Sequence, residues 1–308
     1  MRRLPLAPGG LAGPPCGVLC RNILDAIGHT PLVRLDRLAG DLSVELYGKV
    51  EAANPGGSSK DRLAVFLIDK AESRGLLKPG ATLVEASAGN TGIGLAMVAA
   101  VRGYRCVIVV PHGTSAIKTA IVRAYGAEVV EATADEDFCE RAAHIATRRG
   151  GFRPDQFHNR DNPEAHGCST ADELWHDLDG RIDAVVAVCG TGGTLAGIGR
   201  SLRARNPALR LVRALPVGDD GGESRVEGIA ADGPPPEFEC PGRIEELVVR
   251  DSESVEAARR LARTEAILVG GSGGAALAGA LRWSATAPAG SRVVVVLPDT
   301  GRNYAPSL

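Results

Sequence analysis

The stretch Thr82–Gly103, TLVEASAGNTGIGLAMVAAVRG, contains the pattern that decides the fold. Its first residues, Thr82–Glu85, are typical of a short buried strand. A Gly-rich turn follows, and apolar side chains then recur with a helical period from Thr91 to Gly103, where glycine ends the helix. A strand, a glycine turn and a helix in this order predict one unit of a parallel α/β sheet.

The same alternation continues along the chain from residue 44, which predicts the α/β class. A second helix is expected from Ser59 to about Arg74, ending at Gly75. The expected strands are Val44–Val50, Thr82–Glu85, Cys106–Val110, Glu128–Glu131, Ala184–Val188, Arg210–Ala214, Ala266–Val269 and Val293–Leu297.

Two segments lack regular periodicity. Residues 150–162 are polar, and residues 217–242 are rich in Gly and Pro, so we expect a hinge and a long loop there. The hinge predicts an N-terminal domain of residues 48–159 and a C-terminal domain of residues 21–47 plus 160–308. A ligand site is expected between them, beyond the carboxyl ends of the strands. Residues 1–20, rich in Pro, Gly and Leu, are expected to form a flexible tail.

Composition favours a small-molecule site. The formal net charge of the 308 residues is −2, with no basic stripe, so nothing indicates nucleic acid as a partner. No apolar run approaches the roughly 20 residues of a membrane-spanning helix, so no membrane partner is expected. The seven cysteines contain no C-x-x-C pair, which argues against a disulfide framework or a metal site and favours the cytoplasm.

Four Gly-rich turns each open a predicted helix, and three of them follow predicted strands. Helix N-termini offer free N–H groups, and glycine lets an anion approach the backbone, so such turns suit phosphate and carboxylate. A single turn would be explained by packing alone, but four in one chain are harder to dismiss. The turns are Pro55–Lys60, Ser87–Gly92, Gly190–Thr194 and Gly270–Gly274.

The turn Gly190–Thr194 is the best candidate for binding phosphate, because two threonine hydroxyls add donors to the backbone. It is not a nucleotide P-loop, since the G-x-x-x-x-G-K-[ST] spacing is absent, and no dinucleotide motif is found. A phosphate group on a small cofactor fits the turn.

Lys60 is the candidate for a covalent lysine. It lies beside glycines at the start of an apolar helix, and desolvation at a helix N-terminus lowers the pKa of an amine, as Schiff-base formation requires. From these surroundings alone, an ordinary surface lysine is an equally good interpretation. The other lysines are expected at a strand end or at charged or solvent-facing positions; they are Lys49, Lys70, Lys78 and Lys118.

Together these motifs resemble the fold-type II pyridoxal-phosphate enzymes, and within them the cysteine synthase and cystathionine β-synthase family. The resemblance covers residues 21–305 and begins with Ile27–Leu35, followed by Asn54–Arg62. Further blocks are similar to the catalytic core of the cystathionine β-synthase branch; they are Ala99–Cys106, Thr170–Glu173, Val226–Ile229 and Leu297–Asp299 followed by Arg302–Tyr304. The resemblance implies the two-domain, parallel-sheet fold of the tryptophan synthase β-like enzymes and the cofactor pyridoxal 5′-phosphate.

The resemblance also implies a role for each matching residue. Lys60 would carry the cofactor and take the Cα proton, Asn90 would bind the ring hydroxyl, and Ser272 would lie at the pyridine nitrogen. The implied cofactor-binding set is Lys60, Asn90, Gly190, Thr191, Gly192, Gly193, Thr194, Ser272, Pro298 and Asp299. The implied substrate-binding set, for an amino acid held through N–H and hydroxyl groups, is Ser87, Ala88, Gly89, Asn90, Thr91, Phe157 and Gly228.

The implied reaction is β-replacement on serine or an O-activated serine through an aminoacrylate, most often with a sulfur nucleophile, in a homodimer. The chain departs from the family pattern at Ala88, Phe157 and Ala230, where substrates would lie. A change of specificity, as in a specialised biosynthetic pathway, and neutral drift are both open interpretations.

Other interpretations remain. A serine or threonine dehydratase, or a synthase of the diaminopropionate type, shares the lysine and the phosphate turn, but the Gly28–Pro31 motif favours the β-replacing synthases. A non-catalytic paralogue that binds a protein partner is disfavoured by intact Lys60, Asn90 and Ser272. We expect hydrogen-bonded structural roles for His29 and His166.

Overall fold

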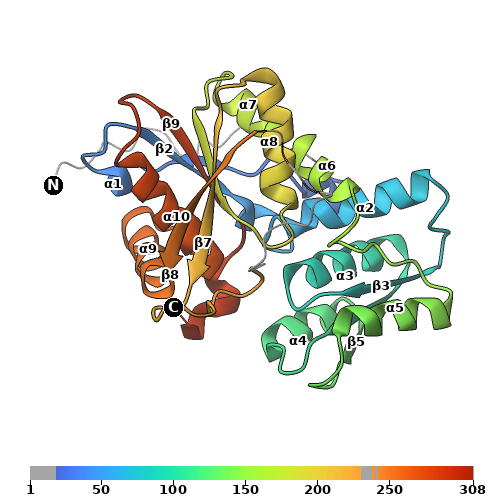
Figure 1. Ribbon diagram of the computed structural model, residues 1–308. Helices are drawn as coiled ribbons and strands as arrows, with labels where there is room; N and C mark the ends of the chain where they lie inside the picture. The colour runs from blue at the N-terminus through green and yellow to red at the C-terminus, as the bar shows by residue number, and fades with distance from the viewer. Residues whose placement is uncertain (1–18, 230–237, 239, 241, 308) are drawn as a thin grey trace.

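The computed structural model describes residues 19–229, 238, 240 and 242–307. The expected tail over residues 1–20 therefore lies outside the described residues, except for its last two. Two β-sheets with helices on both faces make up the molecule (Figure 1). No helix in the described ranges is long and apolar enough to cross a membrane.

The larger sheet has six strands in the order β1-β2-β9-β6-β7-β8. Only the pairing of β1 with β2 is antiparallel, and the other neighbours are parallel. In register, Val293 of β9 lies opposite both Leu46 of β2 and Ala184 of β6. The strands are β1 Leu32–Arg34, β2 Glu45–Val50, β6 Ala184–Val188, β7 Arg210–Val217, β8 Ile244–Arg250 and β9 Arg292–Leu297.

Helices cover both faces of this sheet, as successive strand residues point alternately to the two sides. Val293 and Val295 pack with α1, α9 and α10 on one face, whereas Val294 and Val296 pack with α7 and α8 on the other. These helices are α1 Asp36–Ala39, α7 Thr170–Asp177, α8 Gly193–Arg205, α9 Asp251–Glu265 and α10 Gly271–Ser284, and α6 Asp161–Gly167 packs on α8.

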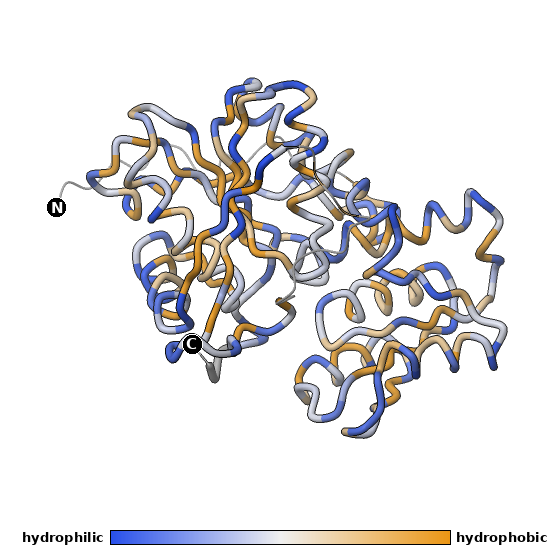
Figure 2. Tube along the Cα trace, in the orientation of Figure 1, coloured by the Kyte–Doolittle hydropathy of each residue, from blue (hydrophilic) through white to orange (hydrophobic). Residues whose placement is uncertain are grey.

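The smaller sheet has three parallel strands, β3 Thr82–Ala86, β4 Arg105–Val110 and β5 Glu128–Glu131. One face packs on α2 Lys60–Ser73, α3 Asn90–Arg102 and α4 Ala116–Ala124, and the other on α5 Phe138–Arg149. Three 3-10 helices complete the described elements: η1 Ile23–Ala26, η2 Glu51–Ala53 and η4 Gly301–Ser307. Hydrophobic residues follow the strands of both sheets (Figure 2), so each sheet has its own core.

Most of the expected strands are present with small shifts at their ends, but one is absent. Residues Ala266–Val269 form no strand; Ala266 ends α9 with a left-handed φ of 59°, and only Val269 makes an isolated bridge, to Thr300. The Gly-rich turn Gly270–Gly274 therefore follows helix α9, which corrects the prediction that it follows a strand. Strands β1 and β8 were not predicted.

The two-domain division itself remains a prediction. Strand β2 of the larger sheet extends to Val50, past the expected boundary between residues 47 and 48. Near the other boundary, Phe152 still bridges to Leu83 of β3, and α6 begins at Asp161. Between Phe152 and Asp161 the chain forms no named helix or strand, and the hinge expected there stays a prediction.

Buried charges fix the start of α2 against the Gly28–Thr30 motif. The Arg62 guanidinium donates to Glu51 and Glu173, and its Nη2 also donates to the Thr30 hydroxyl at 3.0 Å. The fully buried Lys49 ammonium lies 2.7 Å from the Glu173 carboxylate. Lys49 lies near the end of β2, as its sequence context predicts, and it is buried in this cluster, which contacts the start of α2 through Arg62.

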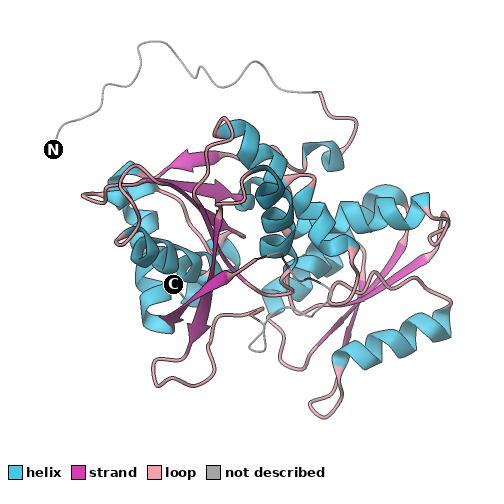
Figure 3. Cartoon of the chain, turned by 45° about the horizontal axis from the view of Figure 1, so that its top comes forward, coloured by secondary structure: helices cyan, strands magenta, loops and turns pink. Residues whose placement is uncertain are grey.

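The carboxyl ends of the parallel strands point toward the space between the two sheets. The segments that follow β3, β4, β6 and β9 all line one cavity there. This is the position at which parallel α/β sheets bind ligands. Figure 3 shows the strands of the two sheets and the helices around them from another side.

Candidate active site

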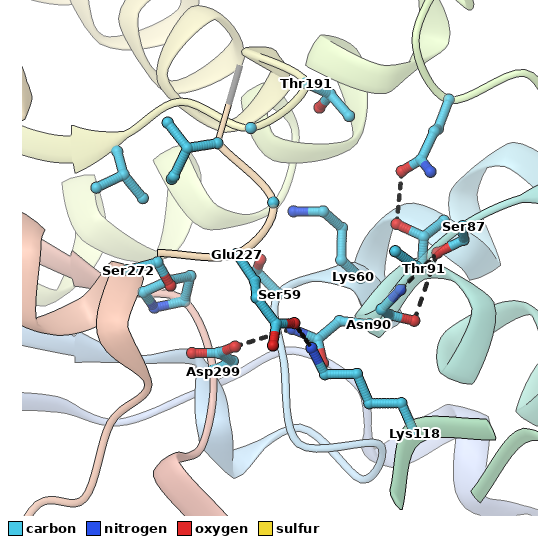
Figure 4. A pocket seen from close by; sticks show the side chains of 18 of the residues that line it. Ser59, Lys60, Ser87, Asn90, Thr91, Lys118, Thr191, Glu227, Ser272 and Asp299 are labelled. Carbon is cyan, nitrogen blue, oxygen red and sulfur yellow. Dashed lines mark hydrogen bonds and ion pairs between the residues drawn. The ribbon is translucent and has the colours of Figure 1, made fainter. Parts of the chain in front are cut away.

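The cavity between the sheets has a volume of about 630 Å³, a size ordinary for a cofactor or metabolite site. Of the residues implied by the family resemblance, all but Gly193 line it. They come from α2, from the segments after β3, β6, β7 and β9, from the segment between α5 and α6, and from the start of α10. Side chains far apart in sequence therefore meet in one space (Figure 4).

Lys60 begins α2, and its side chain projects into the cavity (Figure 4). Burial lowers the pKa of its ammonium, against the opposing effect of the Asp299 and Glu51 carboxylates. Among the described residues, none forms a hydrogen bond or ion pair with its Nζ. An amine with a lowered pKa and no partner is suited to attack a carbonyl.

The turn Gly190–Thr194 leads from β6 into α8. The backbone N–H groups of Thr191, Gly192 and Thr194 have no hydrogen-bond partner within the described part of the chain. Gly192 has a φ of 86°, a left-handed conformation that glycine adopts without strain. Free N–H groups at the start of a thirteen-residue helix suit a phosphate group.

His166 takes the hydrogen-bonded role that was expected of it. One ring nitrogen lies 3.0 Å from the Thr170 hydroxyl and the other 3.1 Å from the Thr194 hydroxyl. Burial lowers the pKa of this imidazole well below its ordinary value, so the ring is neutral. His166 thus supports the turn from α6 rather than lining the cavity.

The turn Ser87–Thr91 leads from β3 into α3 and differs in one respect from expectation. The Ser87 hydroxyl already accepts from the N–H groups of Gly89 and Gly92, and the Thr91 hydroxyl donates to the Gln156 side chain at 2.6 Å. Both hydroxyls are thus engaged within the protein. The N–H groups of Ala88, Asn90 and Thr91 have no partner in the described ranges, so the backbone provides the free donors for a carboxylate.

Ser272 lies at the N-terminal start of α10, across the cavity from Asn90 (Figure 4). The glycines around it have a packing role. A Cβ at Gly274 would approach the Ser254 carbonyl oxygen to 2.1 Å, so glycine there lets α10 lie close against α9. In this turn the packing interpretation of a Gly-rich segment holds, and Ser272 alone faces the cavity.

Asp299 connects the two sides of the site. Its Oδ2 accepts from the Asn90 side chain and from the Tyr304 hydroxyl, each at 2.9 Å. Its Oδ1 is buried without a partner among the described residues, and burial raises the pKa of the carboxyl. An unpaired buried oxygen indicates a site that a ligand completes.

Lys118 was expected to face solvent, but the structure places it in the cavity wall, with 3% of its surface exposed. Its ammonium is ion-paired with Glu227 and lies 4.5 Å from the ring centroid of Tyr304.

No sequence motif identified Lys118, Glu227, Gln156 or Tyr304 as site residues. Glu227 and Tyr304 did lie within family-like blocks, which was the available signal. Ala230 lies outside the described residues.

The chemistry of Lys60, the two sets of free N–H groups and Ser272 fits pyridoxal phosphate. The lysine and the anion-binding turns fit the aldehyde and phosphate of this cofactor, and Ser272 fits its ring nitrogen. A model of the pyridoxal-phosphate dependent enzymes matches residues 23–299. The chain belongs to this family, and it is a pyridoxal-phosphate dependent enzyme.

Similar proteins narrow the group. The chain is 41% identical over 302 residues to cystathionine β-synthase of Apis mellifera, covering 92% of this chain and 60% of that relative. It is 39% identical to cysteine synthase of Staphylococcus aureus, covering 92% and 94%. The crystal structure of an O-ureido-L-serine synthase superposes with a TM-score of 0.87 at 39% identity, covering 93% and 94%.

Proposed function

We propose that this enzyme replaces the β-substituent of serine or an O-activated serine with a sulfur nucleophile. The observation that carries the proposal is that Lys60 shares one cavity with two helix starts whose N–H groups are free among the described residues, at Ser87–Thr91 and Gly190–Thr194. The turn Ser87–Thr91 suits the substrate carboxylate, and the turn Gly190–Thr194 suits the cofactor phosphate. The relatives, named for cystathionine, cysteine and O-ureidoserine synthesis, support this reaction class.

The bound cofactor would withdraw electrons from the substrate, so that the Cα proton and the β-substituent can leave. Lys60 would take and return the Cα proton, since its lowered pKa suits general-base catalysis. Asn90 would orient the ring from the ring-hydroxyl side. Ser272, a neutral hydroxyl, would leave the ring nitrogen unprotonated, which favours β-elimination over transamination.

Lys118 and Glu227 suggest which nucleophile enters. They place a positive and a negative charge beside each other on the cavity wall. The carboxylate and ammonium of an amino acid could replace this pair with charge-assisted hydrogen bonds of their own. We therefore favour a thiol-bearing amino acid, such as homocysteine or cysteine, over sulfide.

The proposal is tested first by trapping the cofactor. Borohydride treatment of the wild type should fix cofactor to the peptide containing Lys60, as measured by mass spectrometry, and Lys60→Ala should retain none. Lys49→Ala is a poor control because Lys49 is a buried ion-pair partner, so Lys78→Ala, on the loop after α2, serves instead. Reducible cofactor trapped in Lys60→Ala would overturn the assignment.

Turnover then decides the reaction. Serine, O-acetylserine and O-phosphoserine should be assayed against sulfide, homocysteine and cysteine, with thioether and thiol products quantified. Release of a 2-oxo acid without any dependence on the nucleophile would indicate a dehydratase, and incorporation of an amine would indicate a diaminopropionate-type synthase. Absence of all turnover despite trapped cofactor would favour the non-catalytic paralogue.

The assembly and location of the enzyme are also proposals. We infer a homodimer, as the family resemblance implies, and a location in the cytoplasm. The Cys106, Cys139, Cys168 and Cys189 thiols are free, which supports a reducing compartment. Light scattering of the purified protein measures the dimer directly, and a monomeric mass at working concentration would contradict it.

A further inference from the structure

A buried hydrogen-bond chain joins the two anion-binding turns of the cavity. The Thr91 hydroxyl, in the turn after β3, donates to Gln156 Oε1 at 2.6 Å. The Asn162 Nδ2 group donates both to the Gln156 carbonyl oxygen at 2.7 Å and to the Thr191 hydroxyl oxygen at 3.0 Å. We name Gln156 and Asn162 the amide bridge, since together they connect Thr91 with Thr191.

The bridge is fixed at the end near β3. Gln156 Nε2 donates to the Ala86 carbonyl at 3.0 Å, and its backbone N–H donates to the Glu85 carboxylate at 3.2 Å. Gln156 is 4% exposed and Asn162 1% exposed, so water does not compete for these bonds. A displacement of the turn after β3 is therefore transmitted to Gln156.

The bridge is equally tight at the end near α8. A Cβ at Gly193 would lie 1.9 Å from Asn162 Oδ1, and one at Gly197 would lie 1.9 Å from the Pro163 carbonyl oxygen. The first turn of α8 thus lies directly against Asn162. This contact explains why Gly193, unlike its neighbours, faces away from the cavity.

The direction of the bonds has a chemical consequence. A hydroxyl oxygen accepts through its lone pairs and donates through its single proton. Because Asn162 donates to the Thr191 oxygen, the Thr191 proton is left to point elsewhere, and Thr191 lines the cavity. Asn162 thereby presents Thr191 as a donor toward an anion.

We propose that Asn162 is a positioning residue that orients Thr191 toward the cofactor phosphate and couples this grip to the substrate turn at Ser87–Thr91. The inference rests on the proposed roles of the two turns. A carboxylate bound at Ser87–Thr91 would restrain Thr91, Gln156 and Asn162 in sequence, and so tighten the hold on the phosphate.

The test uses Asn162→Asp, which keeps the shape but replaces both donated protons with a carboxylate oxygen that would accept the Thr191 proton. Asn159→Asp is the matched control, since Asn159 lies in the same segment, its Nδ2 donates to the Pro154 carbonyl and its Oδ1 accepts from the Asp161 N–H, so its side chain bonds to neither Thr191 nor Gln156. Dissociation constants of apoprotein for pyridoxal 5′-phosphate and for pyridoxal, which lacks the phosphate, are compared. Asn162→Asp should weaken pyridoxal-phosphate binding at least about tenfold and pyridoxal binding far less.

Coupling is read from cofactor dissociation. Saturating L-alanine, which has no β-leaving group, should slow loss of pyridoxal phosphate from the wild type and from Asn159→Asp but not from Asn162→Asp. Equal weakening of both cofactors, or an unchanged effect of L-alanine in Asn162→Asp, would overturn the inference. If Asn162→Asp does not fold, Asn162→Ser, whose hydroxyl is too short to reach Thr191, gives the same comparison.

Neither measurement requires turnover. If Asn162→Asp weakens the binding of pyridoxal phosphate more than that of pyridoxal, but the wild type catalyses no β-replacement, only the proposed reaction is wrong. If the wild type turns over normally and Asn162→Asp shows no such difference, only the proposed role of the bridge is wrong.

Discussion

The Lys118 ammonium is ion-paired with the Glu227 carboxylate across the wall of the active-site cavity. Lys118 comes from α4, beside the smaller sheet, and Glu227 from the loop after β7 of the larger sheet. Lys118 is buried, while 56% of the Glu227 side chain is exposed. The pair therefore presents its acidic member to an entering molecule.

Replacement of Lys118 should separate the nucleophiles. Lys118→Met removes the cation that would bind a nucleophile carboxylate, so the KM for homocysteine or cysteine should rise about 10-fold or more. The KM for sulfide, which has no carboxylate, should change little. Steady-state kinetics with both nucleophiles measure the split, and Lys70→Met, which removes a lysine paired with Glu164 on the surface, is the control. Equal losses with sulfide and homocysteine would show that Lys118 does not recognise the nucleophile.

Ala88 gives a prediction in the opposite direction. It is exposed within the cavity. On either side of it, the Gly89 N–H donates to the Ser87 hydroxyl. Ala88→Ser adds a free hydroxyl beside the N–H groups of the turn, so the KM for the amino-acid donor should fall by about tenfold, the value of a hydrogen bond to a charged group. Kinetics with serine and O-acetylserine measure it, with Ala134→Ser in a loop away from the cavity as the control. An unchanged or higher KM would indicate that the carboxylate does not reach position 88.

The parts of the fold that follow from sequence are those with local signals. Thr82–Gly103 contains a strand, a turn and a helix in consecutive residues, and the structure confirms all three. Strand β8 has no such signal, because it is an edge strand in which Glu245 and Glu246 are tolerated at partly exposed positions. Ala266–Val269 gave a false signal, since a short apolar run does not reveal that Ala266 adopts a positive φ.

The site divides in the same way. Glycine turns and a lysine at a helix start are local patterns, and they identified most of the cavity lining. The position of Lys118 depends on how α4 packs beside the loop of Glu227, 109 residues away in sequence. The periodicity of a sequence predicts local elements and not such long-range contacts. The same holds for Gln156 and Asn162. Gln156 bonds to Thr91 in the turn after β3 of the smaller sheet, and Asn162 bonds to Thr191 in the turn after β6 of the larger sheet.

Stability should depend on Glu173, which accepts from both Arg62 and Lys49. Glu173→Gln leaves two buried cations with less compensation, so the free energy of unfolding at neutral pH should fall by about 3 kcal/mol. The control is Asp172→Asn, because the Asp172 carboxylate pairs with Arg205 on the surface. This variant should lose less than about 1 kcal/mol of unfolding free energy. Urea unfolding monitored by circular dichroism measures both, and similar small losses would show that the cluster is not a stabilising unit.

Glu173 also fixes the sign of an acid effect. Hydrogen bonds from Arg62 and Lys49 outweigh burial and lower the pKa of its carboxyl to about 2. A lowered folded-state pKa gives stability that is present above the unfolded value, 4.5 for this group, and is lost as the pH falls toward 2. The decline in unfolding free energy over this window should therefore be shallower in Glu173→Gln than in the wild type.

Asp61 should produce the opposite dependence near neutrality. Its carboxyl is fully buried, one oxygen accepts from the Gly56 N–H, and the other has no partner among the described residues. Burial raises its pKa from 3.8 to about 7, with Glu51 adding to the rise and Arg62 opposing it. The folded protein thus holds a proton that the unfolded chain has lost, so the free energy of unfolding falls as the pH rises from about 4 to about 7.

Asp61→Asn keeps an oxygen for the Gly56 N–H and cannot ionise. A rise of roughly three units in the Asp61 pKa is equivalent to about 4 kcal/mol. This is the upper limit of the unfolding free energy that the wild type loses with rising pH and that Asp61→Asn should keep. Urea unfolding of the apoprotein at about pH 5 and about pH 8 should therefore show a smaller difference for Asp61→Asn than for the wild type. Asp69→Asn, which removes an exposed carboxylate from the same helix, should keep the wild-type difference. If the slope were the same in all three proteins, the buried carboxyl of Asp61 would be ionised throughout this range, and the fixed start of α2 would have to accommodate a second buried charge beside Lys60.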